Sequence, residues 1–85
     1  MALILIIDES LERLIVLKEF LLETGHNCRL ANTSHMAQEI LGHEYFDILL
    51  CHAENSHQFK GDRRLKIFQS GLDLNKLKEE LNQLS

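Results

Sequence analysis

Residues Leu3–Ser10, LILIIDES, constrain the fold of this chain more than any other stretch. A short apolar run bounded by polar residues is typical of a strand buried on both faces, as in the middle of a parallel sheet. Asp8 and Glu9 then lie at the carboxyl end of that strand, where open α/β sheets bind their ligands. Ser10 can cap a following helix, because its hydroxyl oxygen can accept a backbone N–H of the first turn. The stretch predicts a central strand that ends in a polar site.

After this strand, helical and strand patterns alternate along the chain. Spacings of three and four predict helices, and apolar runs or two-residue alternation predict strands. In chain order, the predicted elements are a strand at 3–7, a helix at about 10–24 followed by Gly25 as a C-cap glycine, an edge strand at 26–31, a helix capped by Thr33 or Ser34 and ended by Gly42, a strand at 45–51, a loop at 52–62 with room for one helical turn, a strand at 63–69 and a helix at 72–84.

The helical patterns also predict which side chains pack on the sheet. Each helix carries an apolar stripe of the kind that covers one face of a sheet. The stripes comprise Leu11, Leu14, Ile15, Leu17, Lys18, Leu21 and Leu22 in the first helix, Met36, Ala37, Ile40 and Leu41 in the second, and Leu74, Leu77, Leu81 and Leu84 in the last.

This alternation predicts a single α/β domain over residues 1–85, with helices on both faces of a parallel sheet. The first and third strands are the most apolar, so we expect them inside a flavodoxin-like sheet of four strands in the order 2-1-3-4. His52 directly follows the third strand. Asp8, Glu9 and His52 are therefore expected to converge at the switch point between strands one and three.

Composition and charge narrow the functional classes. A net charge of −4 argues against nucleic-acid binding, which normally needs a basic stripe. Four charges near the predicted loop, Lys60, Arg63, Arg64 and Lys66, form the one basic cluster and are interpreted as a solvated edge. The N-terminal apolar run is too short for a membrane span and lacks a basic flank, so we expect a soluble, cytoplasmic protein.

The cysteines and the other histidines indicate no metal or redox site. Cys28 and Cys51 form no CxxC pair and are expected to be free thiols in a reducing compartment. The remaining histidines, which are expected to be solvated at the surface, are His26, His35, His43 and His57.

Residues 3–52 resemble the first half of a bacterial response-regulator receiver domain, the CheY-like family. The resemblance rests on the acidic pair Asp8 and Glu9 after strand one, Gly25 after the first helix, Ala31 ending strand two, and Phe46 and Asp47 at the entry to strand three. It implies that Asp8 and Glu9 match the acids that hold Mg²⁺ in the family.

The departures from this family pattern are informative. The position of the phospho-accepting aspartate, six residues after Phe46, is His52, and Cys51 is no substitute acid. The chain also has one βα unit fewer than the five of a receiver. In one alignment the third helix and the final unit are lost, and Ser70 matches the switch serine or threonine. In the other, residues 63–84 are the fifth unit and Ser70 has no switch role.

At the predicted site, His52 cannot replace an aspartate as phosphoryl acceptor, and Mg²⁺ loses a hard oxygen ligand. The site is interpreted as a vestigial pocket in which Asp8 or Glu9 pairs with His52. The alternative is a transition-metal site for Zn²⁺ or Ni²⁺ formed by Asp8, Glu9 and His52, or a pH-responsive site at the same histidine. We assign no resident cofactor, and no nucleophile with a base and an orienting group can be assembled for an enzyme.

The first functional hypothesis is a non-catalytic pseudo-receiver that binds proteins in bacterial signalling. A histidine kinase, another receiver or an effector is its expected partner. A sheet with an open apolar edge tends to be covered, and a small core benefits from association. We therefore expect a homodimer, or docking onto a larger protein, through strand four and the last helix. The second hypothesis is the metal- or pH-responsive binding domain.

Overall fold

The computed structural model describes residues 2–68 and 74–84, without the side chains of residues 83 and 84. A four-stranded parallel sheet has the order β2-β1-β3-β4. This confirms the predicted α/β class and strand order. The elements are β1 (Leu3–Ile7), α1 (Leu11–Glu23), β2 (Asn27–Ala31), α2 (Ser34–Leu41), β3 (Ile48–His52), the 3-10 helix η1 (Ala53–Phe59), β4 (Leu65–Phe68) and α3 (Leu74–Leu84).

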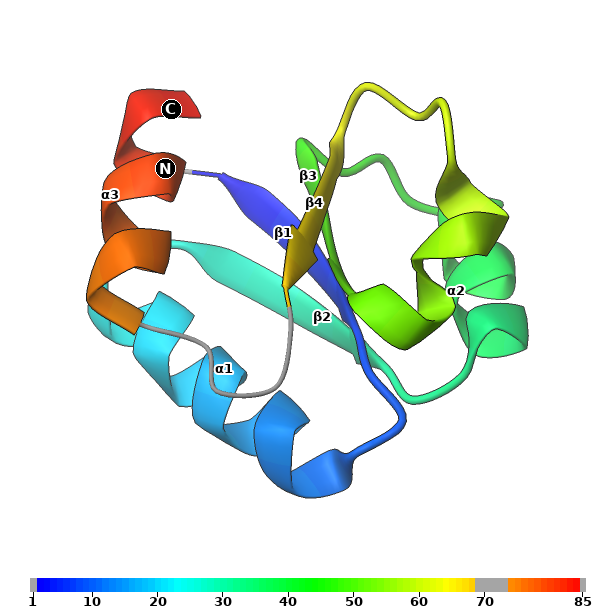
Figure 1. Ribbon diagram of the computed structural model, residues 1–85, viewed down its shortest axis with the longest axis horizontal. Coiled ribbons are helices and arrows are strands. Elements are labelled where there is room, and N and C mark those ends of the chain that lie inside the picture. Colours follow the sequence, from blue (N-terminus) through cyan, green and yellow to red (C-terminus); the bar gives the residue numbers. More distant parts are fainter. Residues whose placement is uncertain (1, 69–73, 85) are drawn as a thin grey trace.

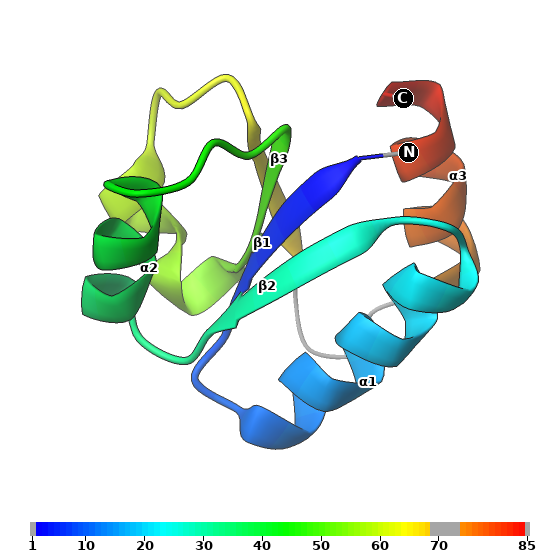
Figure 2. The same ribbon diagram turned by 180° about the vertical axis from the view of Figure 1, so that it is seen from behind.

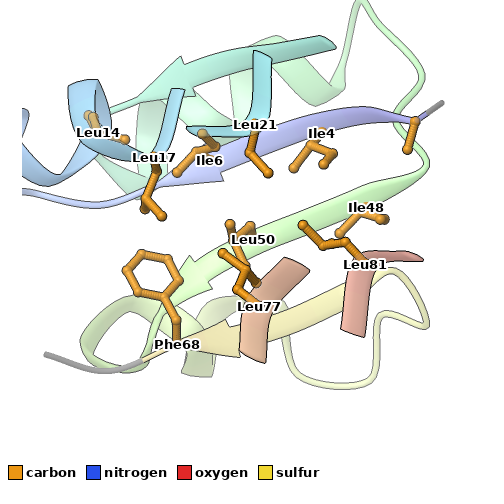
Figure 3. Close-up of a cluster of buried hydrophobic side chains, with 11 residues drawn as sticks. Ile4, Ile6, Leu14, Leu17, Leu21, Ile48, Leu50, Phe68, Leu77 and Leu81 are labelled. Atoms are coloured by element: carbon orange, nitrogen blue, oxygen red, sulfur yellow. The ribbon is translucent and has the colours of Figure 1, made fainter. Parts of the chain in front are cut away.

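The sheet separates two apolar cores, because successive side chains of a strand point to opposite faces (Figures 1 and 2). Helices α1 and α3 cover one face, and α2 and η1 cover the other. On the α1 face, Ile4 and Ile6 of β1 meet side chains of both helices (Figure 3). On the opposite face, Leu5 and Ile7 pack with Ala37 and Phe59. β1 is therefore a central strand, as the sequence predicts.

Helix α1 begins and ends where its sequence predicts. Ser10 is the N-cap, and its hydroxyl oxygen accepts the N–H of Arg13 at 3.3 Å. Thr24 is the C-cap, and Gly25 follows with a φ of 90°, a conformation that glycine adopts without strain. Among the described residues, no helix is long and apolar enough to cross a membrane.

The predicted apolar stripe of α1 is too broad. Only Leu14, Leu17 and Leu21 are buried, whereas 61% of Leu11 and 54% of Ile15 are exposed. Leu22, Lys18 and, on α2, Met36 are exposed as well. The reason is helical geometry. Successive residues are about 100° apart around the helix axis, so the residues at spacings of three and four along the whole of α1 occupy a wider sector than the one that faces the sheet.

Strand β3 is displaced from its predicted range of 45–51. It begins at Ile48, because both the backbone N–H and the carboxylate of Asp47 bond to Leu3 beyond the ladder. It ends at His52, which pairs with Phe68 in the β4 register. The predicted loop at 52–62, with its room for one helical turn, contains the 3-10 helix η1. β4 begins at Leu65 and not at 63, and residue 69 lies outside the described residues.

The position of α3 bears on the two alignments left open by the sequence. α2 and η1 are crossovers that run over one face of the sheet. A right-handed crossover from β4 to a further outer strand would run over that same face. Leu77 and Leu81 of α3 instead lie on the opposite face, in the same apolar core as the buried leucines of α1 (Figure 3). Helix α3 therefore covers the same face of the sheet as α1. This position favours the alignment in which residues 63–84 are the fifth and last βα unit of a receiver.

Candidate functional site

Asp8 lies at the carboxyl end of β1 and is only 1% exposed. Its Oδ1 accepts the backbone N–H of Ser10 at 2.9 Å. Arg13, one turn into α1, donates from Nε to Oδ2 at 2.6 Å and from Nη2 to Oδ1 at 2.9 Å. This two-pronged contact is the strongest geometry between a guanidinium and a carboxylate. Both oxygens of Asp8 are thus engaged by the chain itself.

The electrostatics of Asp8 follow from these contacts. Burial is the largest single influence on its pKa and acts to raise it. The hydrogen bonds from Arg13 and from the Ser10 N–H, with the charge of Arg13, outweigh burial and lower the pKa of Asp8 from its usual value of 3.8. Asp8 is therefore an ionised, buried carboxylate compensated by Arg13.

The sequence analysis missed Arg13, although a signal was present. Ser10 is the N-cap, so Arg13 occupies the third helical position. A helix N-terminus favours acids there, and the frequent capping residue at this position is Glu or Gln. A cation at an electrostatically unfavourable position indicates a specific anionic partner, and Asp8 is that partner.

Glu9, the second acid of the pair, points to a different neighbour. Its side chain is exposed, and Oε1 accepts from Nδ2 of Asn55 in η1 at 3.4 Å, the long end of the hydrogen-bond range. Asn55 is 8% exposed, and its buried Oδ1 has no hydrogen-bond partner among the residues that the structure describes. Because η1 follows β3, the contact joins the ends of the two central strands.

His52 is buried at the end of β3, at 3% exposed. Its Nδ1 accepts the backbone N–H of Glu54 at 3.3 Å, which makes His52 the N-cap of η1. Its ring meets the edge of Phe68, with centroids 5.3 Å apart and planes at 84°. The position of a phosphoryl acceptor thus carries a side chain that caps a helix and packs in the core.

The two cysteines and the four remaining histidines differ in burial. Cys51 is buried, and burial together with the charge of Asp8 raises its pKa to about 11, so its thiol is poorly reactive. Cys28 is half-buried. The prediction that His26 is solvated is wrong: it is 4% exposed, and its Nδ1 accepts the N–H of Ala2 at 3.1 Å where β1 begins. His35, His43 and His57 are exposed, as predicted.

The structure therefore brings Asp8 and His52 near each other but assigns the two oxygens of Asp8 to Arg13. Among residues 2–68 and 74–84, no group of three or more His, Cys, Asp or Glu is arranged to hold a metal ion. Mg²⁺ prefers several oxygen ligands in octahedral geometry, whereas the residues here are an engaged carboxylate, an exposed one and an imidazole. The residues do not fit Mg²⁺. The candidate switch position, Ser70, lies outside the described residues.

Comparison with known proteins identifies the fold. No protein-family model matches the chain, and no curated protein matches its sequence. A response regulator from Thermotoga maritima superposes with a TM-score of 0.77 at 15% identity, covering 96% of this chain and 95% of that one. A fusion that contains the trimeric coiled coil of yeast Spc42 superposes with a TM-score of 0.68 at 17% identity, covering 98% of this chain and 63% of that one.

These likenesses define the class of fold. The chain has the CheY-like fold of a response-regulator receiver, reduced to four strands. The resemblance stated from residues 3–52 is confirmed at the level of the fold.

Proposed function

We propose that this chain is a pseudo-receiver, a non-catalytic protein-interaction module of bacterial signal transduction that accepts no phosphoryl group. The observation that carries this proposal is the Asp8–Arg13 pair at 2.6 Å and 2.9 Å. A guanidinium there supplies the positive charge that a divalent cation supplies in an active receiver, and it cannot be lost at any pH in the physiological range. The pocket is neutralised internally, so the fold is held in one conformation.

The replacement at position 52 supports the same proposal. An imidazole that caps η1 through Nδ1 and packs on Phe68 is committed to the structure. Aspartyl phosphate formation needs a carboxylate nucleophile at this place. A receiver fold without an acceptor retains its surfaces, and surfaces are what a signalling partner recognises.

The alternative, a metal-responsive domain that uses His52 with Asp8 and Glu9, has less support. Arg13 is the competing cation for Asp8, and Glu9 is directed to Asn55. A bound Zn²⁺ would first have to displace a buried salt bridge. The pocket chemistry thus favours the protein-interaction module.

The partner we propose is a protein: a histidine kinase, another receiver or an effector. The structure gives less support than the sequence for a homodimer through β4 and α3. Leu77 and Leu81 of α3 are buried in the chain's own core, which leaves the edge of β4 as the open part of that surface.

The test is chemical. The wild-type chain should show no change in the amide spectra of β1 and β3 on addition of Mg²⁺ with beryllofluoride, and no acid-stable or acid-labile phosphorylation by acetyl phosphate on intact-mass analysis. The matched variant, Arg13→Ala with His52→Asp, restores an acceptor and frees Asp8, so it should acquire Mg²⁺-dependent amide shifts. Phosphorylation of the wild-type chain would contradict the proposal, and Zn²⁺ binding that is lost in His52→Ala would favour the alternative.

A further inference from the structure

The outer edge of β4 is open. β4 is the last strand of the sheet, and in the part of the chain that the structure describes no strand pairs with its far side. The Leu49 N–H bonds to the Arg64 carbonyl at 2.9 Å, and the register continues in parallel to His52 and Phe68. Alternate residues of a parallel strand bond to opposite sides. Ile67 therefore directs its N–H and carbonyl away from β3, toward the open edge.

This edge is also apolar at its exposed position. Ile67 is 56% exposed, whereas its neighbour Phe68 is 3% exposed. The opposite edge of the sheet is protected differently: Arg29 of β2 makes a two-pronged contact with Glu44, at 2.6 Å and 3.0 Å. A charged side chain on an edge strand discourages pairing with another chain unless that chain carries the opposite charge. β4 carries one such side chain, Lys66, but the residue that directs its backbone groups outward is Ile67, and β-branched residues favour strand pairing.

Most of the positive charges around β4 have no ion-pair partner among the described residues. Four of the chain's nine Lys and Arg residues lie between positions 60 and 66. Arg64 pairs with Asp62 at 2.7 Å. Within the described ranges, no ion pair involves Lys60, Arg63 or Lys66. In a chain with a net charge of −4, this is a local concentration of free positive charge beside an open strand edge.

We propose that the β4 edge binds an acidic, extended segment of a partner protein, which adds to the sheet as a fifth strand. This deepens the proposed function and rests on it. Backbone hydrogen bonds to Ile67 supply affinity, and Lys60, Arg63 and Lys66 select for acidic side chains. A second copy of the chain is a poorer occupant, because two β4 edges side by side would bring the same three cations together.

The experiment uses two short synthetic peptides as probes, one of alternating Val and Glu and one of alternating Val and Lys. Amide spectra of the full chain are recorded during titration, with hydrogen exchange at Ile67 as the readout of strand addition. The acidic peptide should shift residues 65–68, slow exchange of the Ile67 amide, and bind at least about tenfold more tightly than the basic one.

Two sets of variants separate the backbone from the charges. Ile67→Pro removes the outward N–H together with the isoleucine side chain, a substitution tolerated on edge strands, and should weaken acidic-peptide binding about tenfold. Ile67→Val keeps the N–H and a β-branched side chain and should not weaken it. Arg63→Glu with Lys66→Glu leaves the backbone intact and should reverse the preference between the peptides.

The inference is overturned if both peptides bind equally, if neither binds at millimolar concentration, or if sedimentation shows a dimer in which the Ile67 amide is protected. Each of these results concerns the β4 edge alone. A chain that fails here but still resists phosphorylation keeps the proposed pseudo-receiver function, and one that takes up a phosphoryl group loses it whatever the peptides do.

Discussion

The carboxyl end of β1 and the outer edge of β4 are both charged, yet they differ in what compensates the charge. At the end of β1, Asp8 is buried and held by Arg13 and the Ser10 N–H. At β4, Arg63 and Lys66 have no ion-pair partner among the described residues. The charge of the buried Asp8 is thus compensated within the chain, whereas no ion pair of the described residues compensates the cations Arg63 and Lys66. The resemblance to a receiver directs attention to the end of β1, whereas the unpaired charges and open backbone groups direct attention to the edge of β4.

The largest effect that this comparison predicts is on stability. Arg13→Gln leaves the buried Asp8 carboxylate without its cation and should lower the thermal midpoint by roughly 10 °C. The matched control at the other region, Arg63→Gln, removes a cation without a partner and should move the midpoint by no more than about 3 °C. Calorimetry or circular dichroism measures both. Equal shifts in the thermal midpoint for the two variants would show that Arg13 and Arg63 contribute alike to stability, and so would contradict the comparison.

The pH dependence of that difference is the next largest effect. The pKa of folded Asp8 is below 3.8, so its ion pair stabilises the fold above that value and is lost as pH falls through the lower, folded value. In Arg13→Gln, burial acts without the guanidinium and should raise the pKa of Asp8. The difference in urea-unfolding midpoint between the two proteins should therefore be greatest at neutral pH and should decrease as the pH falls through 3.8 toward the lowered pKa of folded Asp8. A gap independent of pH would mean that Arg13 acts by packing and not by charge.

The smallest predicted effect concerns His52. His52→Ala removes the N-cap of η1, which is worth about 1 kcal/mol in free energy of unfolding, and also the ring contact with Phe68. His52→Asn loses the same ring contact, but its side-chain oxygen can accept the Glu54 N–H, so it should be about 1 kcal/mol more stable than His52→Ala. Urea denaturation monitors both variants. If Asn behaves like Ala, the cap is not what His52 contributes, and the role assigned to the substituted acceptor position needs revision.

The sequence predicted the sheet well, because strand order follows from burial. Five aliphatic residues before Asp8 are compatible only with an interior strand, and the polar alternation of Asn27–Ala31 only with an edge. The ends of the elements were predicted less well. Asp47 bonds to Leu3 and shifts the start of β3, an interaction between residues 44 positions apart that no local pattern reveals.

For the candidate site, the sequence predicted the position but not the pairing. Asp8, Glu9 and His52 do lie at the ends of β1 and β3. Which groups bond to which depends on side-chain reach: Arg13 extends back over one helical turn to Asp8, and His52 turns its Nδ1 to the start of η1. Ring orientation and guanidinium placement are set by packing, which spacing in a sequence does not encode.

By itself, the sequence determined that the LILII segment of LILIIDES is a central parallel strand and that two acids follow it, because an uninterrupted apolar run is best buried on both faces. Only the tertiary structure decided what those acids do. It turned Arg13 onto Asp8, placed α3 beside α1, buried His26 and left Ile67 at an open edge. These outcomes depend on contacts between distant segments, where the free energy of a charge or an apolar side chain is set by its final neighbours and not by its local pattern.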